Sequence, residues 1–407
     1  MYEGNMLKKL KKYIAESRFA PLFIETNKYG NIVSNINLNL TKKQKHVLLV
    51  YLDMTEAGIQ LASYYSKNEN GALHTNRSEL FQIINIFIQM DYCIDVCAHS
   101  DKRALEYIKM RQYDVIFGLG DVFHWTVNHK SAYKILYLTE NPYDVSHDRE
   151  KERIDYFYER HSRVLPFERT GKFFTKDEEK RVDAIICLGE PEYLRKRGVK
   201  VEHVYPSAFL NSDFQYDKCK RVKNNFLVFG TDGFVHKGID LLIEVFNEHP
   251  EWELYLCGSG ITKYVKNKLH LTIKSNNIHD CGYINIKSDK FLELIYQCPF
   301  ILQPSCSEAV STAVLTGMRH GLIPIVTHGN GFEMLGKERC LFFEGFHIKD
   351  IEFAIKKAVN LPDDYIRTKS KDIYQYANKM FTIDMFTLNM NCAVQNICEG
   401  LTYVNQG

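Results

Sequence analysis

The stretch that decides the fold runs from Phe229 to Phe246 and reads Phe-Gly-Thr-Asp-Gly-Phe-Val-His-Lys-Gly-Ile-Asp-Leu-Leu-Ile-Glu-Val-Phe. An apolar strand, 226–230, enters a loop with three glycines, and the loop opens an amphipathic helix. Glycine lets the backbone approach a ligand closely, and loop N–H groups can cradle phosphate oxygens. Lys237, just before the helix, can place an ammonium group beside a diphosphate. The pattern favours phosphate binding, although glycine and lysine here could also serve turn geometry alone.

A second strand–loop–helix segment follows at residues 302–327, with Glu308 at the end of its loop and a helix expected over 309–320. The first N–H groups of that helix, at 309–311, have no partner within it. With the helix dipole they can hold a sugar hydroxyl or a phosphate, and Glu308 can accept hydrogen bonds from sugar hydroxyls. The alternative is that Glu308 only stabilises the start of its own helix.

Short apolar runs alternate with helical patterns along most of the chain. The alternation predicts parallel sheets with helices on both faces, and two such doubly wound domains would face a cleft at the carboxyl ends of their strands. The charge-dense stretch 148–163 is expected to be a solvent-facing helix. The predicted division is a basic extension 1–45, an amino-terminal domain 46–210, a linker 211–225, a carboxyl-terminal domain 226–380, and a terminal helix 381–407 packing back on the first domain.

The composition excludes several classes of protein. The 407 residues hold 52 Lys plus Arg against 50 Asp plus Glu, so no excess of charge marks a nucleic-acid binder. The 11 cysteines form no Cys-x-x-Cys pair, which fits reduced thiols in a cytoplasmic protein. No apolar stretch reaches the length of a spanning helix. The chain also lacks an Asp-x-Asp triplet, so we expect neither a metal nor another cofactor.

The amino-terminal segment 6–14 places Leu7, Leu10 and Ile14 on one helical face and lysines on the rest. Such a basic amphipathic segment can rest on an anionic membrane surface, although it can equally be a solvated terminal helix. The first interpretation predicts a cytoplasmic protein peripheral to the inner face of the plasma membrane.

Five ordered motifs resemble those of the retaining glycosyltransferases of family 4, which have the GT-B fold. The resemblance is strong over 226–358 and weak over 46–205. The motifs are Lys237–Phe246, Gly258-Ser-Gly260, Cys281-Gly-Tyr283, Pro304-Ser-Cys-Ser-Glu308 and Gly321-Leu-Ile-Pro-Ile-Val326.

The resemblance implies transfer of a sugar from a nucleotide-sugar donor, with retention and without a metal, to a glycan or lipid-linked saccharide in surface polysaccharide biosynthesis. It implies that Lys237 stabilises the leaving diphosphate and that Glu308 binds the donor sugar. Further donor contacts would come from Gly58, Gly230, Thr231, Gly258, Gly260, Ser305, Ala309, Val310, Ser311, Thr312 and Thr316. Contacts to the sugar or acceptor would come from His74, His124 and Asn141.

Two positions depart from the family pattern. Thr316 stands where the family has a second glutamate that binds the nucleotide ribose, and Asp232 stands where an arginine is common. Another cation, with Arg319 or Arg77 as candidates, would then have to assist Lys237. The departures leave open a catalytically weakened nucleotide-sugar-binding protein, and a sugar-nucleotide epimerase on the same scaffold is a further alternative.

Overall fold

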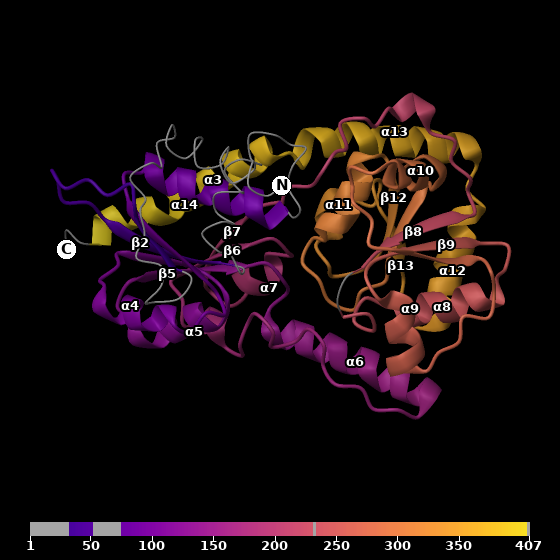
Figure 1. The fold of residues 1–407 in the computed structure, drawn as a ribbon, viewed down its shortest axis with the longest axis horizontal. Helices are drawn as coiled ribbons and strands as arrows, with labels where there is room; N and C mark the ends of the chain where they lie inside the picture. The colour runs from indigo at the N-terminus through magenta and orange to yellow at the C-terminus, as the bar shows by residue number, and fades with distance from the viewer. Residues whose placement is uncertain (1–31, 52–74, 231–232, 405–407) are drawn as a thin grey trace, which may run out of the picture.

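The computed structural model describes residues 32–51, 75–230 and 233–404, which form two α/β domains side by side (Figure 1). The amino-terminal sheet has the order β1-β3-β2-β4-β5-β6-β7, in which β1 is antiparallel to β3 and the other pairs are parallel. Its strands are β1 (Ile32–Ile36), β2 (His46–Tyr51), β3 (Cys93–Ala98), β4 (Val115–Gly118), β5 (Tyr133–Leu138), β6 (Ala184–Cys187) and β7 (Lys200–His203). Its helices are α3 (Thr75–Gln89), α4 (Ala104–Met110), α5 (Gly120–His129), α6 (Tyr143–His161) and α7 (Glu192–Arg195).

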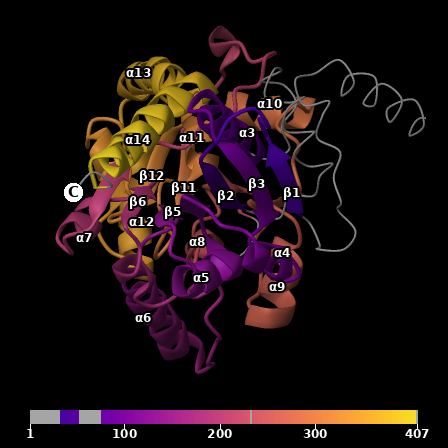
Figure 2. The same ribbon diagram turned by 90° about the vertical axis from the view of Figure 1, so that its left-hand side faces the viewer.

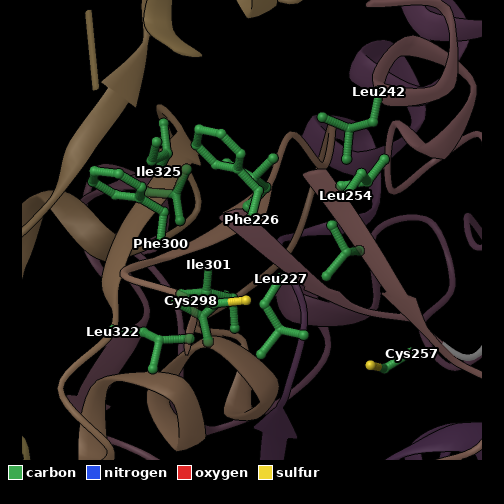
Figure 3. Packing of buried hydrophobic residues seen from close by; sticks show 14 of the residues in the cluster. Phe226, Leu227, Leu242, Leu254, Cys257, Cys298, Phe300, Ile301, Leu322 and Ile325 are labelled. Atoms are coloured by element: carbon green, nitrogen blue, oxygen red, sulfur yellow. The ribbon is translucent and has the colours of Figure 1, made fainter. Parts of the chain in front are cut away.

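The carboxyl-terminal sheet is parallel, with the order β10-β9-β8-β11-β12-β13. Its strands are β8 (Asn225–Phe229), β9 (Glu253–Cys257), β10 (Ile278–Gly282), β11 (Phe300–Gln303), β12 (Ile323–Thr327) and β13 (Leu341–Phe343). The helices of this half are α8 (Ile239–Glu248), α9 (Ile261–Tyr264), α10 (Asp289–Gln297), α11 (Thr312–Arg319), α12 (Ile348–Val359), α13 (Asp363–Met380) and α14 (Ile383–Val404). In the hydrophobic core of this domain, Phe226 stacks on Phe300, with Leu242 and Ile325 nearby (Figure 3).

Two helical crossings join the domains on opposite sides of the molecule (Figures 1 and 2). On one side α13 leads into α14, which returns to the amino-terminal domain and contributes Phe386, Met390 and Val394 to its core. On the other side α6 leaves the amino-terminal domain and contributes Phe157 to the carboxyl-terminal core. Segments distant in sequence therefore complete the core of each domain.

The expectation of a solvent-facing helix over 148–163 is wrong. One face of α6 is buried, and it includes the charged residues Glu150 and Arg153 as well as Ile154 and Phe157. Their charges are matched by partners in the carboxyl-terminal half, so the density of charge in the sequence concealed a packed face.

Other differences are local. The edge strand β1 falls within the stretch expected to be an extension. The helix expected over 263–274 is reduced to α9 and a π-helical turn, Val265–Leu269, which ends at the left-handed His270. Among the described residues, no helix combines the length and apolarity needed to cross a bilayer. None of the 11 cysteines, all of which are described, forms a disulfide.

Candidate functional site

The centre of the site is a lysine–glutamate pair at the carboxyl ends of β8 and β11. Lys237 lies in the turn before α8, and Glu308 lies in the loop between β11 and α11. Lys237 Nζ is 3.6 Å from Glu308 Oε1, and the two side chains are only 15% and 12% exposed. The fold thus brings together the two residues that the sequence singled out for chemistry.

A glycine contact shapes the backbone beside this pair. Gly230 follows β8 and donates its N–H to the Cys257 carbonyl at 2.9 Å. A Cβ at Gly258 would lie 1.6 Å from the Gly230 carbonyl oxygen, so that position accepts glycine only. Gly260 has φ +74° and open space around it, at the start of α9. The ends of β8 and β9 therefore approach one another with no side chain between Gly230 and Gly258.

Amide side chains hold the Glu308 loop in place. Asn330 accepts the Glu308 N–H at 2.9 Å and donates to the Ser305 carbonyl at 3.0 Å. From the amino-terminal domain, Asn141 donates to the Ser307 hydroxyl at 3.1 Å and to the Gly329 carbonyl at 3.1 Å. The loop is fixed from both domains, so Glu308 is positioned before any ligand arrives.

Ser305 Oγ and Asn141 Oδ1 are buried beside the lysine–glutamate pair without a hydrogen-bond partner, whereas Glu308 Oε1 is buried with Lys237 Nζ as its ion-pair partner. A buried polar atom left unpaired costs roughly 1–3 kcal/mol. Their gathering in and beside one loop indicates a place where a ligand supplies the missing donors.

Electrostatics keep Glu308 ionised. Burial alone would raise the pKa of Glu308, but Lys237, Arg169 and His236 together lower it below its usual value. His236 is itself buried, with Nδ1 3.4 Å from Cys306 Sγ and 3.7 Å from Glu150 Oε1. Burial opposes its protonation, yet these partners raise the pKa of His236 to about 10. The loop therefore carries a carboxylate that can accept hydrogen bonds near neutral pH.

The loop residues expected to bind the donor have differing surroundings. Helix α11 begins at Thr312 with Ser311 as its N-cap, three residues later than expected, so 309–311 are loop residues rather than the first helical turn. Ala309 and Val310 are buried, and Ala309 lies against Gly189 of the other domain. Contact between the donor and the backbone of 309–311 stays a prediction.

Thr316 has a hydroxyl that is already engaged. Its Oγ1 donates to the Thr312 carbonyl at 2.8 Å and accepts the Phe209 N–H at 3.4 Å. The hydroxyl proton is thus already donated, so a ribose hydroxyl could only donate to the remaining lone pair of Oγ1, and the ribose contact stays a prediction.

His124 lies on α5 and bonds to Thr175 Oγ1 through Nδ1 at 2.9 Å, with Glu178 Oε1 at 3.7 Å. Burial, followed by the charge of Arg181, lowers its pKa. These contacts stay within the amino-terminal domain, and its contact to a sugar stays a prediction. Gly58, His74, Thr231, Asp232 and the segment 6–14 lie outside the described residues.

Assistance of Lys237 by Arg319 or Arg77 stays a prediction. Arg319 donates to the Ala208 carbonyl and to Asn378 Oδ1, so it serves the domain junction. Arg77 lies in the first turn of α3, and it is not among the groups that chiefly lower the pKa of Glu308. Arg169 is among them, and no motif in the sequence marks it.

The comparisons with known proteins agree with this geometry. Residues 214–380 match the family described as Glycosyl transferases group 1. The sequence matches no curated protein. Among solved structures, HepE of Anabaena in complex with UDP and glucose has a TM-score of 0.53 at 12% identity, over 86% of this chain and 100% of that one. Sucrose-phosphate synthase from Thermosynechococcus elongatus has 0.54 at 12%, over 88% and 100%. A glycosyltransferase from Rickettsia africae has 0.51 at 11%, over 87% and 99%.

The two facing α/β domains and these structural matches define the GT-B class. Residues 214–380 carry a group 1 glycosyl transferase domain. The family resemblance indicated by the sequence motifs is confirmed. Within the described ranges, no cluster of three or more His, Cys, Asp or Glu side chains has the arrangement of a metal site.

Proposed function

We propose that the chain transfers a sugar, with retention, from a nucleoside diphosphate sugar to a glycan or lipid-linked saccharide of a surface polysaccharide. The observation that carries the proposal is the pairing of Lys237 with Glu308 at the carboxyl ends of β8 and β11, beside Ser305 Oγ and Asn141 Oδ1, which are buried without a hydrogen-bond partner. UDP in the HepE complex supports a uridine diphosphate sugar as the first donor to test.

Lys237 is the group that faces the leaving diphosphate. Negative charge develops on that diphosphate as the glycosidic bond breaks, and a preorganised ammonium stabilises the charge without reorganisation. Lys237 is paired with Glu308, so an arriving diphosphate exchanges one anionic partner for another. The leaving phosphate then takes the proton of the attacking hydroxyl, which needs no second carboxylate.

Glu308 holds the donor sugar. Its pKa lies below the usual value because Lys237 and Arg169 outweigh the effect of burial, so it is an acceptor near neutral pH. Asn330 fixes the backbone at Glu308, and Asn141 fixes Ser307 from the other domain. Sugar hydroxyls would donate hydrogen bonds to Oε1, which has Lys237 Nζ at 3.6 Å as its ion-pair partner.

The reaction is tested with thermal shifts against UDP-, GDP-, ADP- and CMP-sugars, followed by transfer to saccharide acceptors. We expect one nucleotide-sugar to stabilise the protein and the product to keep the anomeric configuration of the donor. An inverted product would contradict retention, and a donor converted without acceptor would favour the epimerase. Activity should survive EDTA; loss of activity with rescue by manganese would contradict metal independence.

A membrane contact is proposed for the end of the amino-terminal domain remote from the cleft. Leu40 and Met110 are 90% and 64% exposed. A groove of about 520 Å³ at the amino ends of β2 and β4 is lined by Met110 together with Lys42 and Lys43. Exposed apolar side chains beside lysines match an anionic lipid surface, which the segment 6–14 would also contact. The contact would anchor the enzyme and leave the cleft free.

Flotation with phosphatidylglycerol or phosphatidylcholine vesicles tests the anchor. The full chain should float with the anionic vesicles only, and Leu40→Asp or removal of residues 1–20 should reduce its recovery. Equal recovery of all three forms with anionic vesicles would contradict the anchor.

A further inference from the structure

The motifs that predict the diphosphate site supply fewer positive charges than a pyrophosphate has negative charges. The pyrophosphate of a nucleotide-sugar carries two negative charges, and Lys237 supplies one positive charge. Position 232, where an arginine was expected, is an aspartate. A second cation therefore has to come from a different part of the chain.

Arg169 reaches the site from the amino-terminal half of the sequence. It belongs to the α6 arm, which we define as residues 143–170. A Cβ at Gly233 would lie 2.9 Å from Arg169 Cγ and 3.1 Å from Cδ, so the arginine passes directly over the glycine-rich loop that precedes Lys237. Its guanidinium is paired with Glu140, and the two side chains are 16% and 15% exposed. It is also one of the cations that lower the pKa of Glu308.

The backbone that carries Arg169 is held by one buried carboxylate. Glu150 on α6 accepts the N–H groups of Glu168 at 2.7 Å, Arg169 at 3.1 Å and Thr170 at 2.8 Å. The same Glu150 oxygen that accepts the first two lies 3.7 Å from His236 Nδ1, one residue from Lys237. The loop is thus anchored on the turn that presents Lys237.

The rest of the arm is fastened to the carboxyl-terminal domain. Arg153, which is fully buried, donates to the Val235 carbonyl at 3.2 Å and to the Pro304 carbonyl at 2.9 Å. Arg160 donates to Asp240 at 2.5 Å. These contacts place Arg169 beside Lys237 and Glu308, although it precedes strands β6 and β7 of the amino-terminal sheet in the sequence.

We propose that Arg169 is the second cation of the diphosphate site and binds a phosphate oxygen directly, in place of the arginine absent at position 232. Glu140, its ion-pair partner, is exchanged for phosphate when the donor arrives. A planar guanidinium suits phosphate oxygens, and its carboxylate partner avoids leaving the charge uncompensated before binding. The inference rests on the proposed function and assigns part of its donor site.

Calorimetric titration of the full chain with UDP, GDP and ADP, and with the monophosphate of whichever binds most tightly, tests this role. Arg169→Met should weaken the diphosphate roughly 10- to 100-fold and the monophosphate much less. Arg163→Met is the matched control, because Arg163 lies on the same arm and donates to the carbonyls of Leu269 and Lys268. Its affinities should equal those of the unmodified protein.

Glu140→Gln gives a test of opposite sign. Loss of the competing carboxylate should tighten diphosphate binding roughly two- to fivefold. Unchanged diphosphate binding in Arg169→Met, or equal weakening of mono- and diphosphate, would overturn the inference. If Arg169→Met fails to fold, the Glu140→Gln variant decides by itself: unchanged or weaker diphosphate binding would overturn the role of Arg169. If the unmodified protein binds no nucleoside diphosphate, the proposed function fails instead.

Discussion

The glycine-rich loop with Lys237 and the α6 arm lie against each other, yet they relate to the sequence in opposite ways. The loop belongs to one continuous strand–loop–helix segment, from β8 to α8, and Lys237 lies within that segment. The arm extends from the other domain, and its buried Arg153 bonds to Val235 and Pro304, which are 82 and 151 positions away. Local motifs thus reveal the reacting groups, whereas the residues that support them appear only in the fold.

The arm contributes packing as well as charge. Phe157 is fully buried in the carboxyl-terminal core, while Tyr158, the next residue, is 51% exposed. Phe157→Ala should lower the free energy of unfolding by about 3–5 kcal/mol, because it empties a core position. Tyr158→Ala, its matched control, should change stability by no more than about 0.5 kcal/mol. Urea unfolding measures both; equal effects would show that α6 is not packed as described.

The loop should dominate catalysis rather than stability. Lys237→Ala should remove about 2–4 kcal/mol of transition-state stabilisation, because a preorganised cation is lost where charge develops. Lys263→Ala, at an exposed lysine of α9, serves as the control. Steady-state kcat/KM measures the loss, and a near-normal rate for Lys237→Ala would refute the catalytic role of the lysine.

The contact between arm and loop should depend on pH. Burial disfavours ionised Glu150, but His236, Thr170 and the N–H of Glu168 outweigh it and lower the pKa of Glu150 from 4.5 to about 2. A carboxyl with a lowered folded-state pKa stabilises the protein above its unfolded pKa. That contribution, about 2–3 kcal/mol, is lost as pH falls from about 4.5 toward 2.

Glu150→Gln should therefore be less stable at pH 7 and lose less stability on acidification than the unmodified protein. Urea midpoints between pH 3 and pH 7 measure this difference. The acidic groups elsewhere are common to both proteins, so parallel curves would contradict the assigned ion pair.

The smallest effect on activity is expected for Asn330, which positions the Glu308 loop and is not expected to contact the substrate. Asn330→Ala removes the two bonds that hold the Glu308 loop and should cost about 1–2 kcal/mol in kcat/KM. Asn360→Ala is a control, because Asn360 ends α12 and bonds only within that helix through its side chain. If Asn330→Ala and Asn360→Ala show the same kcat/KM, the hydrogen bonds of Asn330 to the Glu308 loop have no role in catalysis.

Much of the carboxyl-terminal fold could be predicted because its elements are locally consistent. Strand β8 is an apolar run, and α8 follows it with Gly238 as its N-cap, in a left-handed conformation that favours glycine. The strands that were missed lack such signals. Strand β10 reads Ile-His-Asp-Cys-Gly, and β13 has only three residues. Their pairing with longer neighbours, rather than their own pattern, makes them strands.

The site was predicted in part for the same reason. Lys237 and Glu308 stand in motifs, so their juxtaposition followed from two parallel strands ending at one edge. Arg169 stands in no motif, and its position depends on Glu150 being buried. A charge-rich helix suggests exposure when partners in the other domain are unknown. The arm was misjudged because long-range ion pairing, not periodicity, decides its burial.

A crystal structure with a nucleoside diphosphate bound tests the central claim most directly. The account predicts the diphosphate in the crevice at the carboxyl ends of β8 and β11, with a phosphate oxygen within hydrogen-bonding distance of Lys237 Nζ. A diphosphate bound elsewhere, with Lys237 directed into bulk solvent, would contradict it.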